Sequence, residues 1–434
     1  SIKNESGIIS ESLNLQKRCR FQKLFRELTK YLKSGNNMEK NEKLVSQPIT
    51  RRKVVKGIAA TGAVASVGPW ILPKKALSSS GEVNVLLWSD YCPPGFIKAF
   101  KKKTGITMNF TGIGSNEEII NKMKATKGRG FDVCSPTNMR SLQWEPLGLL
   151  QPIDYGRIPN VKNLNPAMLA VGDNEWNFGG KGSHWLPQIW GTEGIAWRND
   201  KWTPPRSVGG VAMPSYGDIW QSDVEGKTMM RPHSGMLGAG LYMETTGALE
   251  PGAMKLAYSD EAVMRKTWQK VTDFCIKNKK QVKLFWNDAD SQKTGFMNQG
   301  VVVGQTWDGP PTVQMKEGLP VVYRAPIEGS LAWVDGLCLS SSSANSDQAY
   351  AFLDFCFDAV AAGRSIDGGG IEGWGQHGYN SAVLGADKNA SPDYGKWFNQ
   401  IYPGKSLANL WPWPKEPQWY ADVRTEYRNK FVNA

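Results

Sequence analysis

The sequence predicts an α/β protein of two lobes, each a mainly parallel sheet flanked by helices, with a ligand cleft between the lobes. Strand-like and helix-like segments alternate from residue 83 to residue 363, the pattern that builds parallel sheets covered by helices. The alternation runs in two series. The roughly 350 residues that follow residue 80 also exceed what one hydrophobic core ordinarily holds.

The first series reads strand, helix, strand, helix, strand. Residues 83–88, 106–112 and 131–136 are apolar runs typical of strands. The helix over 93–105 has proline in its first turn, and Gly105 ends it. The helix over 115–125 begins with Ser115 and Glu118, the two residues of a capping box.

The second series repeats this order after residue 190. Its expected strands and helices follow from apolar runs and from helical spacing respectively. The strands are 194–199, 226–232, 282–286, 301–307, 319–326 and 331–341; the helices are 234–247, 261–278, 288–300 and 346–363.

An export signal is expected near the N-terminus. Arg51 and Arg52 precede a weakly apolar run over 57–72, which is followed by Lys74, Lys75 and small residues. About twenty strongly apolar residues are needed to span a membrane, so this run is too short and too soft. The arginine pair resembles a twin-arginine signal, and we expect residues 38–79 to be such a signal peptide.

The position of this signal so far along the chain has two explanations. Met38 is the first methionine, and we expect residues 1–37 to be an upstream or non-native leader. The alternative is a genuine presequence, because Leu24, Leu28 and Leu32 lie at helical spacing among basic residues and could meet a membrane surface.

Charge excludes one class of partner. The chain carries a formal charge of +12, but residues 1–80 hold 16 basic and 5 acidic residues, which leaves 36 basic and 35 acidic residues in the remainder. A nearly neutral domain lacks the positive field that nucleic acid binding requires, so we expect no nucleic acid partner. Three scattered histidines and cysteines without a C-x-x-C motif favour neither a metal site nor a cofactor.

Tryptophan beside acid recurs where strands are expected to end. The residues concerned are Trp88, Ser89, Asp90 and Tyr91; Trp190 and Glu193; Trp307 and Asp308; and Trp333 and Asp335. An indole face attracts a cation with roughly 0.5–2 kcal/mol, whereas removing an ammonium from water costs several kcal/mol. A buried amine therefore needs the carboxylate as well as the indole. A single such motif is more often a core tryptophan beside a turn aspartate, but four of them favour a binding site for a cationic ligand.

The chain from about residue 83 to residue 430 resembles the spermidine/putrescine-binding proteins of ABC importers, which have the type II periplasmic binding fold. The stretches that carry this resemblance are LLWSDYCPPGFIKAFKKKTGI, FDVCSPTNMRSLQWEPLGLLQPID, HWLPQIWGTEGIAWRND, GQTWDG and LAWVDGLCL. The resemblance implies a periplasmic, monomeric binding component that delivers a small-molecule amine to permease subunits in the inner membrane.

The resemblance also implies roles for particular residues. Trp88, Asp90 and Tyr91 match the aromatic, acid and tyrosine of the first strand end in that family, and Thr137 and Asn138 match a polar pair after the third strand. Trp307 and Trp333 match its two sandwiching tryptophans, and Asp335 matches the acid that fixes a terminal amine. The departure is at Arg231, which stands where that family has acids. It could receive a carboxylate or pair internally with Asp308.

We therefore predict a binding protein for a polyamine-like or diamine-like cation. Lobe one is expected over 82–193 and 335–384, and lobe two over 194–334 and 385–434. The alternatives are a zwitterion or carboxylate held by Arg231, such as an amino acid, and a carbohydrate-binding protein or glycosidase. No G-x-S-x-G, H-E-x-x-H or phosphate-loop motif is present, and we expect no enzyme.

Overall fold

The computed structural model describes residues 81–404 and 406–434, so the expected leader and export signal lie outside the described residues. The main sheet has twelve strands, and its principal path runs β2-β1-β3-β12-β5-β10-β8-β9. The described residues include no helix that is long and apolar enough to cross a bilayer.

One end of the sheet is a parallel group of three strands, here called the first strand group. It consists of β1 (Glu82–Trp88), β2 (Thr107–Ile113) and β3 (Val133–Cys134). The connecting helices are α2 (Pro94–Thr104) and α3 (Asn116–Thr126). As predicted, Gly105 ends α2 in the left-handed conformation and the Ser115 side chain caps α3 by accepting from the Glu118 N–H.

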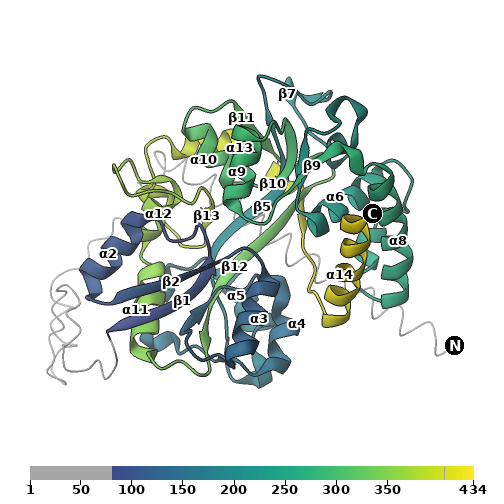
Figure 1. Ribbon diagram of the computed structural model, residues 1–434. Helices are drawn as coiled ribbons and strands as arrows, with labels where there is room; N and C mark the ends of the chain where they lie inside the picture. Colours follow the sequence, from purple (N-terminus) through teal and green to yellow (C-terminus); the bar gives the residue numbers. More distant parts are fainter. Residues whose placement is uncertain (1–80, 405) are drawn as a thin grey trace, which may run out of the picture. The chain divides into compact units, whose positions relative to one another are not determined.

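The other end is a second strand group, also parallel. It consists of β10 (Val303–Trp307), β8 (Thr228–Met230) and β9 (Val282–Phe285). Its helices are α6 (Pro232–Thr245), α8 (Glu261–Lys277), α9 (Ala289–Asn298) and α10 (Gly309–Lys316). The C-terminal helix α14 (Gln418–Asn433) packs on α8 and α6, on this part of the molecule (Figure 1).

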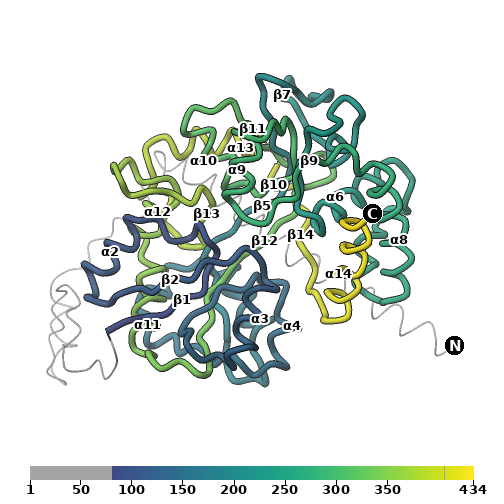
Figure 2. Tube along the Cα trace, viewed as in Figure 1, coloured from purple at the N-terminus to yellow at the C-terminus, as the bar shows by residue number. Residues whose placement is uncertain are grey.

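Two long strands join the groups. β5 (Leu186–Arg198) and β12 (Ser330–Ser340) pair antiparallel, and both run through the middle of the molecule (Figures 1 and 2). Trp190, Glu193, Trp333 and Asp335 were expected at strand ends but lie inside these two strands. The prediction of their positions was wrong because both strands continue from one group into the other without a break.

The remaining helices and strands lie around the two strand groups and the two long strands. They are α4 (Ser141–Trp144), β4 (Leu150–Gln151), α5 (Pro166–Glu175), β6 (Ser207–Val208), β7 (Val211–Ala212), α7 (Ala253–Leu256), β11 (Val321–Arg324), α11 (Ser346–Cys356), α12 (Ala359–Asp367), β13 (Asn380–Ser381), α13 (Tyr394–Ile401) and β14 (Leu410–Pro412). The predicted helix over 346–363 is two helices. Asp358 separates them, because its side chain caps the new helix by accepting from the N–H groups of Val360 and Ala361.

Candidate functional site: a pocket between the two strand groups

A pocket lies where the two strand groups and the two long strands meet. Nine of the thirteen site residues predicted from the sequence line it: Trp88, Asp90, Tyr91, Thr137, Glu193, Arg231, Trp307, Trp333 and Asp335. They come from the carboxyl ends of β1, β3, β8 and β10 and from the middle of β5 and β12. This is the position at which α/β sheets ordinarily bind ligands.

Two carboxylates line the pocket, the buried Asp335 and the half-buried Asp90. The Tyr91 hydroxyl donates to Asp335 Oδ2, and Asp335 Oδ1 has no hydrogen-bond partner among the described residues. Burial raises the pKa of Asp335 to about 7, although the Thr137 and Tyr91 side chains lower it. Burial also raises the pKa of Asp90 to about 6, opposed by a hydrogen bond from Tyr379. Each carboxylate therefore carries an unfavourable charge that a bound cation would stabilise.

Aromatic rings form the neighbouring walls. The rings of Trp88 and Trp307 meet edge to face with centroids 5.7 Å apart, and Trp333 meets Tyr379 in the same way at 5.5 Å. Trp333 Nε1 has no hydrogen-bond partner among the described residues. Gly191 stands directly opposite Trp333 across the strands, and a Cβ there would lie only 2.6 Å from the indole. Glycine at this position therefore gives Trp333 its place in the pocket.

The second strand group contributes a cation, and the long strand β5 contributes an acid. Arg231 follows β8 immediately before α6, and its Nη2 donates to the Gly114 carbonyl at 2.5 Å. Its guanidinium lies over the rings of Trp307 (5.2 Å) and Trp286 (5.5 Å). Glu193 accepts from Gln305 Nε2 at 2.7 Å, and burial raises its pKa. The expected alternative pairing of Arg231 with Asp308 does not form.

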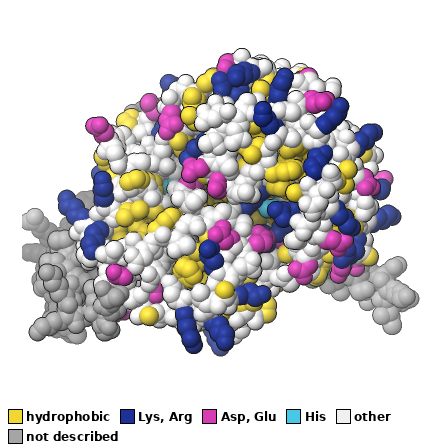
Figure 3. Space-filling view, in the orientation of Figure 1, with side chains coloured by type: hydrophobic (Ala, Val, Ile, Leu, Met, Phe, Trp, Pro, Cys, Tyr) yellow, Lys and Arg dark blue, Asp and Glu magenta, His cyan; other side chains and the backbone are white. Residues whose placement is uncertain are grey.

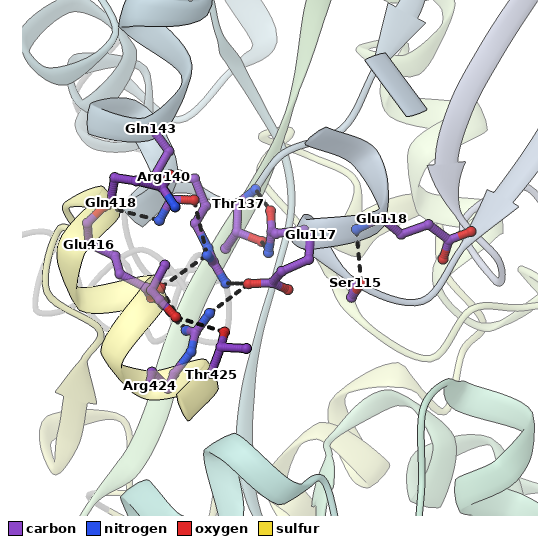
Figure 4. A network of polar contacts seen from close by, with 12 residues as sticks. Ser115, Glu117, Glu118, Thr137, Arg140, Gln143, Glu416, Gln418, Arg424 and Thr425 are labelled. Atoms are coloured by element: carbon purple, nitrogen blue, oxygen red, sulfur yellow. Dashed lines mark hydrogen bonds and ion pairs between the residues drawn. The ribbon is translucent and has the colours of Figure 1, made fainter. Parts of the chain in front are cut away.

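Four ion-paired residues form a cluster (Figure 4), and two of them, Glu117 and Arg140, line the pocket. Arg140 pairs with Glu117 and Glu416 at 3.0 Å each, and Arg424 pairs with the same two acids at 2.6 and 2.7 Å. Burial alone would raise the pKa of Glu117, but the two arginines outweigh it and hold this pKa well below its usual range. Two positive and two negative charges make the cluster neutral as a unit.

This cluster also ties the C-terminal segment to the first strand group. Glu117 belongs to α3, and Arg140 belongs to the short helix η2 (Asn138–Arg140). Glu416 precedes α14, and its N–H donates to the Met139 carbonyl at 2.9 Å. Because α14 packs on the second strand group, the four residues bridge the two halves at the edge of the pocket.

Four predicted residues do not line the pocket. Ser89 is exposed, and Asn138 accepts from the Val334 N–H at 3.0 Å. Trp190 lies on the opposite face of β5 from Glu193, and its indole donates to the Ser381 carbonyl. Asp308 follows Trp307, is buried and does not line the pocket; it accepts from the Tyr402 hydroxyl at 2.5 Å. Burial raises the pKa of Asp308 to about 7.

Seven lining residues were not predicted: Asn116, Glu117, Met139, Arg140, His233, Tyr379 and Trp413. Asn116 and Glu117 open the helix after β2, so the strand-end rule could have found them. Tyr379 and Trp413 come from segments with no periodic pattern, and no signal in the sequence marks them. Many of the other tryptophans, such as Trp176 and Trp185, stack in the core instead.

The distribution of charged and metal-ligating side chains is relevant to ligands other than an amine. Basic and acidic side chains are interspersed over the face shown in Figure 3, and acidic side chains gather around the hollow in its middle. Within residues 81–404 and 406–434 no group of three or more His, Cys, Asp or Glu side chains could hold a metal ion.

Two parallel strand groups joined by long crossing strands, with a pocket between them, define a two-lobed solute-binding protein. A model of the family described as bacterial extracellular solute-binding protein matches residues 95–363, and the chain belongs to this family. It is a family of binding proteins, so the expectation that the chain is no enzyme is confirmed.

Known relatives and solved structures agree with this assignment. The chain is 24% identical over 343 residues to the spermidine/putrescine-binding periplasmic protein of Escherichia coli K12, covering 79% of this chain and 89% of that protein. A putrescine-binding periplasmic protein of the same organism is 26% identical over 331 residues, covering 71% and 81%. A putative spermidine/putrescine ABC transporter structure from Listeria monocytogenes superimposes with a TM-score of 0.66 at 21% identity, over 81% of this chain and 99% of that one. The predicted fold class is thereby confirmed.

Proposed function

We propose that this protein captures a small organic ammonium compound in the pocket and delivers it to an ABC permease. The observation that carries the proposal is the meeting of two carboxylates, the half-buried Asp90 and the buried Asp335, with the indoles of Trp88, Trp307 and Trp333. Neither carboxylate forms an ion pair with a lysine or arginine in the part of the chain that the structure describes. An ammonium between them would supply the missing counter-charge, and the rings would pack its methylenes.

Two features of the relatives support the same ligand class and partner. The Escherichia coli relatives are described as spermidine/putrescine-binding and putrescine-binding, and both are periplasmic. The Listeria structure is described as part of an ABC transporter. We extend to this chain a periplasmic location and an ABC permease in the inner membrane as its partner. A monomeric state and export through the twin-arginine-type signal over 38–79 are part of the proposal on the basis of the sequence alone.

The lobe boundaries remain part of the proposal. Lobe one is 82–193 with 335–384, and lobe two is 194–334 with 385–434. Hinge motion about β5 and β12 would open the pocket, and closure would exclude water and strengthen each charge contact.

A thermal-shift screen of the purified chain tests the ligand class. The panel contains diamines, polyamines, amino acids and betaines, with dicarboxylates and sugars as matched negative compounds. A ligand present at 100 times its Kd stabilises the folded state by about 2.7 kcal/mol, which is a readable shift. Stabilisation by ammonium compounds is the expected result; stabilisation by sugars or by dicarboxylates alone would refute the proposal.

A further inference from the structure

Two arginines line the pocket, and one of them, Arg231, forms no ion pair among the described residues. Arg231 lines the pocket and lies beyond ion-pairing distance of every carboxylate within residues 81–404 and 406–434; its hydrogen bond goes to the Gly114 carbonyl. A guanidinium has five N–H donors, so most of its donor capacity is not used by this bond.

The other charges near Arg231 do not cancel it. Arg140 and Arg424 are fully matched by Glu117 and Glu416, so this cluster contributes no spare acid. Glu193 is the first charged neighbour that acts on Arg231, but it lies outside ion-pairing distance and gives an oxygen to Gln305.

His233, which also lines the pocket, adds no second positive charge. Burial holds the pKa of His233 well below its usual range, and the charges of Arg424 and Arg231 lower it further. Arg231 is therefore the unmatched positive charge of the described pocket.

Asp90 and Asp335 lie together in the pocket, and the acid that acts most strongly on Arg231 is a third one, Glu193. The Tyr91 hydroxyl donates to Asp335, the Tyr379 side chain lowers the pKa of Asp90, and the rings of these two tyrosines are 5.8 Å apart. Both acids therefore serve one end of a ligand rather than two ends. The Arg231 guanidinium, which lies over the rings of Trp307 and Trp286, is the positive charge available to the other end.

We propose that the ligand is a zwitterion, with an ammonium held by Asp90 and Asp335 and a carboxylate held by Arg231 through its planar fork. This inference rests on the proposed function, because it assigns the second end of the same amine ligand. A guanidinium matches a carboxylate with two parallel hydrogen bonds. A second ammonium at this end would instead meet a like charge.

Isothermal titration of the full chain with two compound series tests this assignment. The first series is α,ω-amino acids with two to six carbons, and the second is diamines of matched chain length. The best amino acid should bind at least about ten times more tightly than its matched diamine. Charge-assisted hydrogen bonds of this kind correspond to losses of about ten- to a hundred-fold when one partner is removed.

Arg231→Gln should impose that loss on the amino acid and leave diamine binding unchanged or stronger. Arg231→Lys keeps the charge without the fork and should give an intermediate loss, which also guards against misfolding of the first variant. Arg324→Gln is the matched control. Arg324 also lies over an indole, Trp197 at 5.7 Å, and donates to a backbone carbonyl, Ala212 at 2.7 Å, but it does not line the pocket.

Two outcomes would overturn the inference. If diamines bind as tightly as matched amino acids, or if Arg231→Gln weakens both series equally, then Arg231 only holds the halves together through Gly114. In that case the amine proposal still stands. If no ammonium compound binds while simple carboxylates do, the proposed function itself is wrong.

Discussion

Replacing Asp335 with asparagine should weaken ligand binding and stabilise the empty protein at the same time. Asp335 is 3% exposed, and Tyr91 donates to its Oδ2. Asparagine keeps an acceptor for Tyr91 but removes the counter-charge of the bound ammonium. Breaking a buried charge pair costs about 3–5 kcal/mol, so the affinity should fall by at least about a hundred-fold.

The effect on the empty protein follows from the pKa. A carboxyl group whose pKa is raised from 3.8 to about 7 makes folding less favourable as pH rises between these two values. At pH 7 this corresponds to about 4 kcal/mol, at about 1.4 kcal/mol per pKa unit. The new amide nitrogen would replace Oδ1, which has no partner, at a cost of about 1–3 kcal/mol. The net expectation is a stabilisation of about 1–3 kcal/mol.

The assays are titration calorimetry for affinity and urea unfolding of the unliganded protein for stability. Trp333→Leu provides the comparison, because the loss of one stacking or cation–π face costs roughly 1–3 kcal/mol of binding. The reasoning is refuted if Asp335→Asn binds normally, if it loses less affinity than Trp333→Leu, or if it destabilises the empty protein. Normal binding by Asp335→Asn together with abolished binding by Arg231→Ala would mean that the acid of the ligand anchors it.

Three further outcomes are expected. Affinity for the amine should fall as pH is lowered from 8 to 5, because Asp90 and Asp335 take up protons near pH 6 and pH 7 and a neutral carboxyl group lacks the charge that attracts a cation. An affinity that stays constant over this pH range would contradict the prediction. Glu416→Gln should lower the free energy of unfolding by about 3 kcal/mol, because it removes one of the two acids that pair with the buried Arg140 and Arg424. The control Glu426→Gln breaks exposed ion pairs of α14 and should change the free energy of unfolding by less than about 1 kcal/mol. Equal effects of the two variants in urea unfolding would show that the cluster does not stabilise the protein. A protein that begins at residue 80 should fold and bind like the full chain, and loss of either property would show that residues 1–79 belong to the folded domain.

The strand and helix order was predictable because it depends on local patterns. The cap at Ser115 and the stop at Gly105 are each set by a few neighbouring residues. The faces of the long strands were not predictable in this way. Trp190 and Glu193 share a short motif, yet strand alternation places them on opposite faces, and only the pairing of β5 with β12 decides which face meets the pocket. Tyr379 and Trp413 reach the pocket through tertiary packing of irregular segments, which no local pattern records.

The charges of the pocket explain how one framework could select among related amines. The Trp and Asp residues provide attraction for an ammonium, but they do not distinguish a diamine from an amino acid. Arg231 is expected to make this distinction, because it attracts the carboxylate of an amino acid and repels the second ammonium of a diamine. Two like charges 4 Å apart at a protein surface repel by about 4 kcal/mol, enough to exclude a second ammonium at micromolar concentrations. The four-residue cluster beside it is already neutral, so it cannot offset this repulsion. Selectivity in this pocket is therefore expected to depend on the end opposite Asp335, where the residues depart from those that the resemblance to polyamine-binding proteins implies.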